Sequence, residues 1–319
     1  ISRNSDQTFY FDARLDWKRS FGDHNLTAMA MYMMREYRSD VLPNRNQGYS
    51  GRVTYDYASK YLVEFNFGYN GSERLAAGHR FEFFPAVSAG WVASSEKFWE
   101  PISKYINHFK IRGSYGLVGS DAFASGAPHF LYQNNIGIGS AHNFWTGLPT
   151  SEISKKGPGF YVLAVQDAGW EHVKKFDIGF DMMLFNQLNI TFDYFHDKRE
   201  RILMSRASWP SMLGYWGSKP WSNIGEVENQ GFELSLNWTK QFGKDLTLDL
   251  RGNFTYNQNE YKYVDEPSYP YVWQTNTGKP LNTVKGYIAE GLFTSEEEIA
   301  NSPDQSQLGA NIMPGDIKY

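Results

Sequence analysis

The chain has 319 residues, a net charge of -4 and no cysteine, and 17% of its residues are aromatic, yet its mean hydropathy is -0.54. These values exclude a disordered chain, which is poor in aromatics, and disulfides or thiolate metal sites, which need cysteine. They also exclude a nucleic-acid binder that relies on counterion release, because there is no basic surplus.

Alternation with a period of two begins at residue 8 and recurs along the chain. Phe9, Phe11 and Leu15 fall on one face of the first segment, and Asp12 and Arg14 fall on the other. Successive side chains of a strand point to opposite faces, so each such segment predicts a two-faced strand. The segments are 8–17, 49–57, 61–69, 109–117, 188–194, 232–238 and 246–256, and weaker ones near 26–35, 83–93 and 173–184 complete a count of ten.

The predicted strands are long, and aromatic residues gather near their ends, as Tyr61 and Tyr69 do. A membrane-crossing strand needs about 9–11 residues, whereas soluble strands average about 5–6. Outer-membrane barrels carry aromatic girdles where the apolar band meets the headgroups. A soluble β-sandwich also alternates and buries aromatics, so these two features alone leave both folds open. No apolar run reaches the roughly 18 residues of a membrane helix.

The connections between the segments decide between the two folds. They are short at 18–25, 58–60, 186–187 and 242–245, intermediate at 94–108, and long at 36–47, 71–80, 119–172, 198–228 and 258–319. Short periplasmic turns that alternate with long extracellular loops are typical of outer-membrane barrels, and a Greek-key sandwich has no reason to alternate in this way. The chain is therefore predicted to be all-β, part of a transmembrane antiparallel β-barrel, with roughly ten strands. Phe65 should face lipid and Glu64 the lumen.

Six stretches of the chain resemble the SusC-like (SusC/RagA) TonB-dependent receptors of Bacteroidetes outer membranes. They occur along the chain in the same order as in that family. One such motif would be weak, but six from about residue 80 onward are specific, while the first 70 residues match only as generic barrel strands. The stretches are FFPAVSAGW (83–91), KIRGSYGLVG (110–119), WEHVKKFDIGFDMMLFN (170–186), NIGEVENQGFELSLNW (223–238), GYIAEGLF (286–293) and PGDIKY (314–319).

The resemblance implies the middle to later part of a large plugged barrel of about 22 strands. The plug domain, the TonB-contacting segment, and the early and last strands of the barrel would then be absent from this sequence. The sequence begins at Ile1 without a methionine or a signal-peptide pattern. In FFPAVSAGW the residues expected to face inward, Phe84, Ala86, Ser88 and Gly90, are mostly small. They would let the plug pack closely against the wall, so we interpret this motif as a feature of the wall rather than as a ligand contact.

The resemblance also implies a function and a location. Such proteins lie in the outer membrane of Gram-negative bacteria, in contact with its lipid, and import oligosaccharides or peptides with a SusD-like surface lipoprotein. Energy would come from the TonB–ExbB–ExbD complex through the missing plug, and no cofactor is implied. Two alternatives remain open at this point: a structural or adhesive outer-membrane barrel, and a soluble glycan-binding β-sandwich.

The long loops hold the candidate ligand-binding residues. Aromatic faces stack on sugar rings and anchor peptides, and the cluster around residues 209–221 also holds the glycines and prolines that shape a rigid loop. The alternative is that these rings pack the loops together or form the lipoprotein interface. The residues expected to contact ligand are Trp209, Tyr215, Trp216, Trp221, Tyr271 and Trp273.

No catalytic or metal-binding constellation is visible, so an enzyme is not expected. The seven histidines are scattered without metal-ligand spacing, and IGIGS (136–140) lacks the strand–turn–helix context of a nucleotide site. Glu296, Glu297 and Glu298 lack the spacing of a calcium loop. We expect them to form a short solvated helix capped by Ser295.

Overall fold

The computed structural model describes residues 6–38, 43–123, 127–137, 143–146, 153–210, 212, 219–309 and 311–319. They form two compact units, residues 1–281 and residues 282–319, which are described separately. In the described part of the chain no helix is long and apolar enough to cross a membrane.

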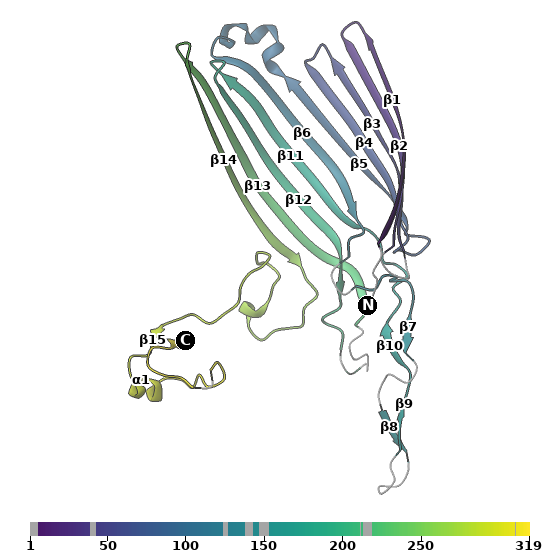
Figure 1. The fold of residues 1–319 in the computed structure, drawn as a ribbon, viewed down its shortest axis with the longest axis vertical. Helices are drawn as coiled ribbons and strands as arrows, with labels where there is room; N and C mark the ends of the chain where they lie inside the picture. The colour runs from purple at the N-terminus through teal and green to yellow at the C-terminus, as the bar shows by residue number, and fades with distance from the viewer. Residues whose placement is uncertain are drawn as a thin grey trace. The chain divides into compact units, whose positions relative to one another are not determined.

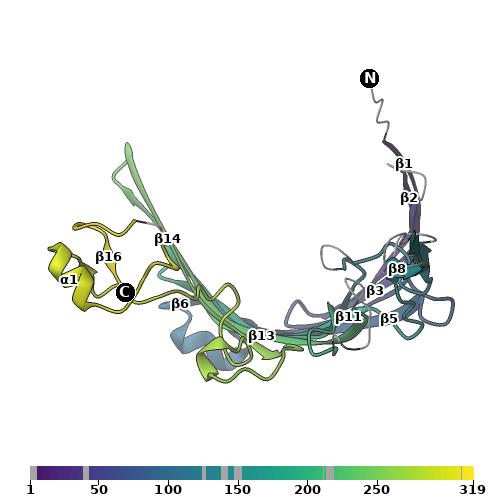
Figure 2. The same ribbon diagram turned by 90° about the horizontal axis from the view of Figure 1, so that it is seen from below.

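The first unit is built on one antiparallel sheet of ten strands, in which each strand pairs with its neighbours along the chain (Figure 1). Figure 2 shows this sheet edge-on as a curved layer. All ten predicted strands are confirmed, including the three with weak alternation. The strands are β1 (Gln7–Phe21), β2 (His24–Arg38), β3 (Asn44–Tyr57), β4 (Tyr61–Ser72), β5 (Phe81–Val92), β6 (Ile106–Ser120), β11 (Glu171–Leu184), β12 (Leu188–Ser205), β13 (Trp221–Phe242) and β14 (Leu246–Tyr263).

The tight turns share one rim of the sheet, and the long connections of this unit leave from the other (Figure 1). Ala58 and Ser59 have φ of 52° and 56°, and Phe185 and Asn186 have φ of 53° and 52°, as in the type I′ turns that suit the twist of a hairpin. The intermediate connection between β5 and β6 holds two 3₁₀ helices, η1 (Ala93–Ser95) and η2 (Lys97–Ile102). It lies on the tight-turn rim although it spans 93–105 and is longer than the connections 39–43 and 73–80 on the opposite rim, so it is the exception to the expected alternation of short and long connections.

Several strands run further toward the long-loop rim than the alternation of apolar residues indicates. β12 continues to Ser205 and β13 begins at Trp221, so the connection expected at 198–228 is only 206–220. The extensions carry charged pairs between neighbouring strands, such as Lys198 with Glu226 at 3.5 Å and Lys262 with Glu228 at 2.8 Å. Alternation of apolar residues cannot reveal such strand ends, because polar side chains occupy both faces of the strand there.

The segment expected as a long loop at 119–172 contains two small antiparallel strand pairs, the second of which lies within the connection of the first. β7 (Asn135–Gly137) pairs with β10 (Gly159–Val162), and β8 (Asn143–Thr146) pairs with β9 (Ile153–Lys156). After β14, the first unit ends in a further connection with one 3₁₀ helix, η4 (Val272–Gln274). The long-loop rim therefore carries additional paired strands, and the opposite rim carries the 3₁₀ helices η1 and η2.

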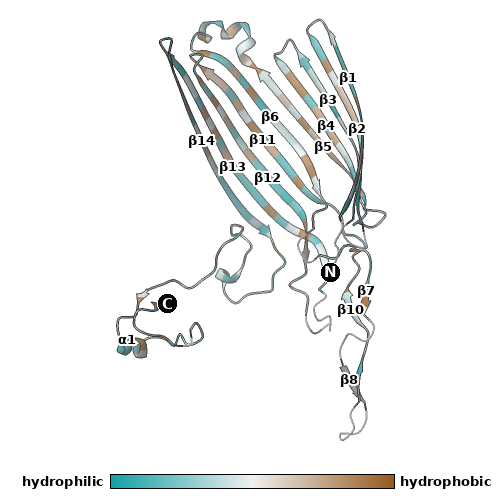
Figure 3. Ribbon diagram, in the orientation of Figure 1, coloured by the Kyte–Doolittle hydropathy of each residue, from teal (hydrophilic) through white to brown (hydrophobic). Residues whose placement is uncertain are grey.

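The two faces of the sheet differ in polarity, as the banding of the strands in Figure 3 shows. Phe65 lies in register with Val53 and Val87 on one face, while Glu64 lies in register with Thr54 and Ser88 on the other. The apolar face is open: 43% of Phe65 and 73% of Leu15 are exposed. Soluble monomers rarely expose an apolar surface of more than a few hundred Å², so this face suits lipid rather than water.

The second unit, residues 282–319, is organised around the buried side chain of Phe293. β15 (Gly291–Leu292) pairs with β16 (Ile317–Lys318), and the helix α1 spans Glu296–Asn301. The hydroxyl of Ser295 accepts a hydrogen bond from the backbone N–H of Glu298 at 3.2 Å. This confirms the predicted short helix with Ser295 as its N-cap.

Candidate functional site: the polar face and the long-loop rim

The polar face of the sheet carries a row of small and charged side chains that runs across five strands. Thr54, Glu64, Ser88, Ser114 and Asp177 are successive partners in register on β3, β4, β5, β6 and β11. A hollow of about 460 Å³ lies over this row. Polar and small residues make up most of its lining, together with Tyr55, Leu62 and Val63, so the hollow can hold water or a polar group.

A cluster of four charges stands at one end of this hollow. Arg112 of β6 contacts Asp193 of β12 at 2.7 Å, and Asp181 and Asp177 of β11 at 3.3 and 3.6 Å. Thr191 donates a hydrogen bond to Asp181 at 3.2 Å. Charges at mid-strand in a membrane protein face an aqueous interior or one another, because lipid would not solvate them. The polar face therefore suits the lumen of a barrel.

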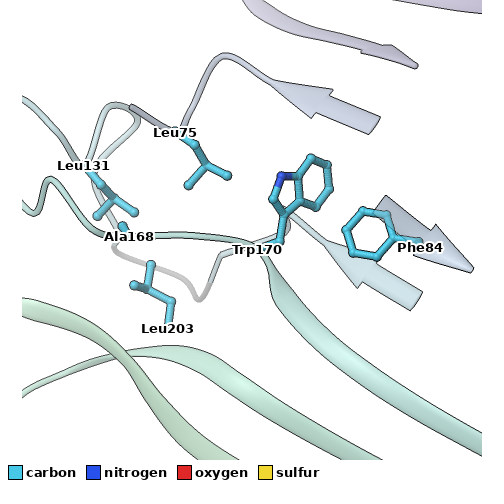
Figure 4. Packing of buried hydrophobic residues seen from close by; sticks show 6 residues of the cluster. All are labelled: Leu75, Phe84, Leu131, Ala168, Trp170 and Leu203. Carbon is cyan, nitrogen blue, oxygen red and sulfur yellow. The ribbon is translucent and has the colours of Figure 1, made fainter. Parts of the chain in front are cut away.

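Two long connections, the ones after β4 and after β6, meet residues of the strands β5 and β12 at the long-loop rim and form a small apolar core (Figure 4). Trp170 is 5% exposed, packs its ring edge against Phe84 at 5.4 Å between centroids, and donates its indole N–H to the carbonyl of Arg80 at 3.0 Å. Buried Trp needs such a partner for its N–H. The core thus fixes the loops to the sheet. Its buried members are Leu75, Phe84, Leu131, Ala168, Trp170 and Leu203.

A buried carboxylate joins the same core to β12. Glu171 is 1% exposed; its side chain pairs with the guanidinium of Arg199 and accepts a hydrogen bond from the backbone N–H of Leu203 at 3.2 Å. A buried charge is tolerated when it is paired and hydrogen-bonded in this way. The loops at this rim are consequently held by polar as well as apolar contacts.

Two of the predicted ligand-binding residues form an exposed pair of rings after β14. Tyr271 and Trp273 stack at 5.9 Å between ring centroids with an interplanar angle of 13°, and they are 60% and 63% exposed. Lys279 braces this turn, because its ammonium donates to the carbonyls of Val272 and Trp273 at 3.3 and 2.6 Å. The pair is therefore a flat apolar surface held in one orientation.

The other predicted site residues lie elsewhere. Trp221 is half-buried and packs against the apolar core at the rim, which is the packing role considered as the alternative for these rings. Trp209 is half-buried in the turn after β12, where its backbone N–H donates to the carbonyl of Arg206 at 3.3 Å. Tyr215 and Trp216 lie outside the described residues.

Asp265 ties this turn to the loop after β14. It accepts hydrogen bonds from the backbone N–H of Ser208 at 3.0 Å, from the hydroxyl of Ser208 at 2.8 Å, and from Arg206 at 3.3 Å. Burial works to raise the pKa of Asp265, but the bonds from Ser208 and the charge of Arg206 outweigh it and hold this pKa below its usual value. The ionised form of Asp265 therefore holds the two loops together.

The sequence predictions missed the Arg112 cluster. Its members alternate with apolar residues at inward positions of three strands, and this placement was the available signal. Among the described residues, no group of three or more histidines and carboxylates is arranged to hold a metal ion. The structure thus offers a polar wall, an organised loop rim and an exposed aromatic pair.

Comparisons with known proteins agree with this architecture. A family model described as TonB dependent receptor-like, beta-barrel matches residues 2–300. TonB-dependent receptor P3 of Formosa agariphila is 31% identical over 256 residues, which cover 76% of this chain and 24% of that protein. TonB-dependent receptor P39 of the same organism is 28% identical over 284 residues, covering 88% and 26%. SusC of Bacteroides thetaiotaomicron is 26% identical over 239 residues, covering 71% and 22%. The chain thus spans about a quarter of the length of these relatives.

Solved structures show the same fold. The RagAB peptide importer in its closed-closed state matches with a TM-score of 0.65 at 20% identity, covering 80% of this chain and 30% of that one. The siderophore receptor PirA from Acinetobacter baumannii matches with a TM-score of 0.53 at 12% identity, covering 86% and 38%. Together with the ten-stranded sheet, the matches identify the family: the chain belongs to the TonB-dependent receptor-like β-barrels, is SusC-like, and lies in the outer membrane of a Gram-negative bacterium.

Proposed function

We propose that this chain forms part of the wall of an outer-membrane importer that takes up oligosaccharides or peptides. The observation that carries the proposal is the polar face of the sheet, with its hollow and the Arg112 cluster. In a closed barrel whose apolar face contacts lipid, this face supplies an aqueous route for a polar solute. The names of the relatives support the energy source, because a TonB-dependent receptor depends on TonB, and the ExbB–ExbD proteins complete that complex.

A SusD-like surface lipoprotein is the proposed partner at the long-loop rim. The elaboration of that rim supports this partner, because the rim carries an apolar core, small strand pairs and exposed rings that a plain pore does not need. The likeness to SusC and to the RagAB peptide importer supports it as well. Co-purification of one defined lipoprotein with the full-length receptor, and its loss when the loops at 127–137 and 153–170 are shortened, would test this partner.

The ring pair Tyr271–Trp273 is the proposed ligand contact, and the half-buried Trp209 and Trp221 are proposed to act with it, together with Tyr215 and Trp216. Stacking on an aromatic face is worth about 0.5–1.5 kcal/mol beyond area burial, so Tyr271→Ala with Trp273→Ala should weaken substrate binding about tenfold. Lys244→Ala, in the exposed tight turn between β13 and β14, is the matched control and should leave binding unchanged. Unchanged binding in the double variant would remove the ring pair from the site.

The import proposal is tested by deleting the full-length gene and supplying defined nutrients. Growth and uptake of labelled oligosaccharides and peptides are compared in the deletion strain, in the complemented strain, and after the proton gradient is collapsed. Import predicts uptake that needs both the gene and the gradient. Uptake that continues without the gene would refute it, and a deletion that impairs only surface attachment would favour the structural or adhesive alternative.

A further inference from the structure

A small polar pocket lies on the lumen side of the sheet, at the rim with the long loops. Arg35 and Tyr37 of β2 are in register with Asn46 and Asn44 of β3, on the same face as the polar row of Thr54 and Glu64. The pocket has a volume of about 220 Å³. Arg74, from the connection after β4, and Asp121, from the connection after β6, complete its lining.

The lining of this pocket holds two positively charged side chains, Arg35 and Arg74, and one negatively charged side chain, Asp121. Within the described part of the chain, Arg35 makes no ion pair or hydrogen bond, and its guanidinium lies over the ring of Tyr37 at 5.8 Å. Arg74 lies over the ring of Phe123 at 4.4 Å and donates to the carbonyl of Asp121 at 3.0 Å. The Nε atom of Arg74 is buried and has no hydrogen-bond partner among the described residues.

The one carboxylate in the lining does not neutralise the two arginines. Asp121 accepts a hydrogen bond from the side-chain amide of Asn46 at 2.7 Å, and no ion pair joins it to Arg35 or Arg74 among the described residues. Burial lowers the pKa of Arg74, and the charge of Asp121 offsets only part of that effect. The Nε–H of the half-buried Arg74 thus has no acceptor among the described residues; leaving such a buried donor unpaired is costly, and a bound anion would relieve that cost.

We propose that this pocket binds an oxyanion of the imported substrate, a carboxylate or a sulfate ester. Planar guanidinium groups match such anions with paired hydrogen bonds. Asn44 and the hydroxyl of Tyr37 supply neutral donors and acceptors for the groups beside the anion. The role in uptake rests on the proposed import function, because it takes the polar face to be the lumen. Anion binding itself does not depend on that function.

The first test uses an inorganic oxyanion and needs no knowledge of the substrate. Crystals of the full-length receptor are soaked in selenate, and the anomalous signal of selenium is measured. A peak between Arg35 and Arg74 is expected, and it should vanish in the double variant Arg35→Gln with Arg74→Gln. Arg38→Gln is the matched control, since Arg38 is three residues away on β2 and pairs with Glu36 at 3.0 Å. No peak in the wild-type receptor would overturn the proposal.

The second test separates the sources of the anion. Uptake is measured for uronate or sulfated oligosaccharides, for their carboxyl-reduced or desulfated forms, and for acidic and amidated peptides. The double variant should lose about tenfold or more of the affinity for the anionic member of a pair, because it loses charged hydrogen bonds, and it should leave the neutral member unchanged. Equal uptake of both members by wild type and variant would overturn the pocket's role. Selenate binding without uptake of any probe would instead contradict the proposed import function and would leave the anion-binding pocket supported. Heat-modifiable migration on gels confirms that each variant barrel has assembled.

Discussion

One face of the sheet is apolar and the other is polar, so the same substitution at adjacent positions of β5 should change the stability of the folded receptor by different amounts. Val87 lies in register with Phe65 and Tyr115 on the apolar face, and Ser88 lies in register with Glu64 and Ser114 on the polar face. Both positions are near the middle of a strand of 12 residues. The two positions therefore lie at the same depth in the membrane and differ only in the face of the sheet to which their side chains belong.

Val87→Arg places a charge in lipid near the midplane, which costs about 2–4 kcal/mol. At about 1.4 kcal/mol per tenfold change, the folding equilibrium falls roughly 30- to 700-fold. Ser88→Arg places the same side chain on the wet face beside the carboxylate of Glu64, where it avoids lipid and meets only the space in which the plug is expected to pack, so a smaller loss of stability than for Val87→Arg is expected.

The assay is refolding of the full-length receptor into phospholipid vesicles across a urea series, with the folded fraction read from heat-modifiable migration on gels. A clear shift of the midpoint for Val87→Arg, with a smaller one for Ser88→Arg, is the expected result. Equal tolerance of both substitutions, or a larger loss for Ser88→Arg, would refute the assignment of the faces.

Two further predictions concern the close packing around Gly179 of β11 and the loop contact made by the carboxyl group of Asp265, which depends on pH. A Cβ at Gly179 would clash with the carboxylate of Asp193 and with the carbonyl oxygen of Phe192 on β12, whereas one at Gly113 on the neighbouring strand meets only the carbonyl oxygen of Asp177, at 3.5 Å. Gly179→Ala should therefore destabilise the β11–β12 pair by about 1–3 kcal/mol and Gly113→Ala should not; equal urea midpoints would contradict this. The lowered pKa of Asp265 means that its contribution is present above the unfolded value of about 3.9 and is lost as pH falls through the folded pKa. Asp265→Asn should lower stability by about 1–2 kcal/mol at pH 7, and the difference in Tm from wild type should shrink as pH falls below about 4 and disappear only below the lowered pKa of folded Asp265; a difference that does not shrink over this range would show that ionisation is not its cause.

Much of the fold could be predicted because its determinants are local. The two-residue period located all ten strands, and Ser295 before three glutamates located the helix α1. Loop lengths identified the rims, since turn length follows directly from the spacing of the strands. The far ends of β12, β13 and β14 could not be predicted, because pairs such as Lys262 with Glu228 hold them together across strands.

The site was less predictable, because its parts meet only through the topology. Arg112 and Asp193 are 81 residues apart in sequence, and the oxyanion pocket joins two strand ends to two separate connections. The loop aromatics could be identified as a class, but composition does not tell an exposed ring from a packing one. Trp221 joins the rim core, while Tyr271 and Trp273 remain open to solvent.

The central claim is that this chain spans the outer membrane with its tight turns in the periplasm and its long loops outside. The chain has no cysteine, so single cysteines can be introduced by Lys244→Cys in the turn between β13 and β14 and by Val272→Cys in the loop after β14. Intact cells carrying the full-length receptor with no other cysteine are treated with a membrane-impermeant maleimide. Labelling of the Val272→Cys variant on intact cells is expected, with labelling of the Lys244→Cys variant only after the outer membrane is permeabilised. Labelling of the Lys244→Cys variant alone on intact cells, or equal labelling of both variants, would contradict the account.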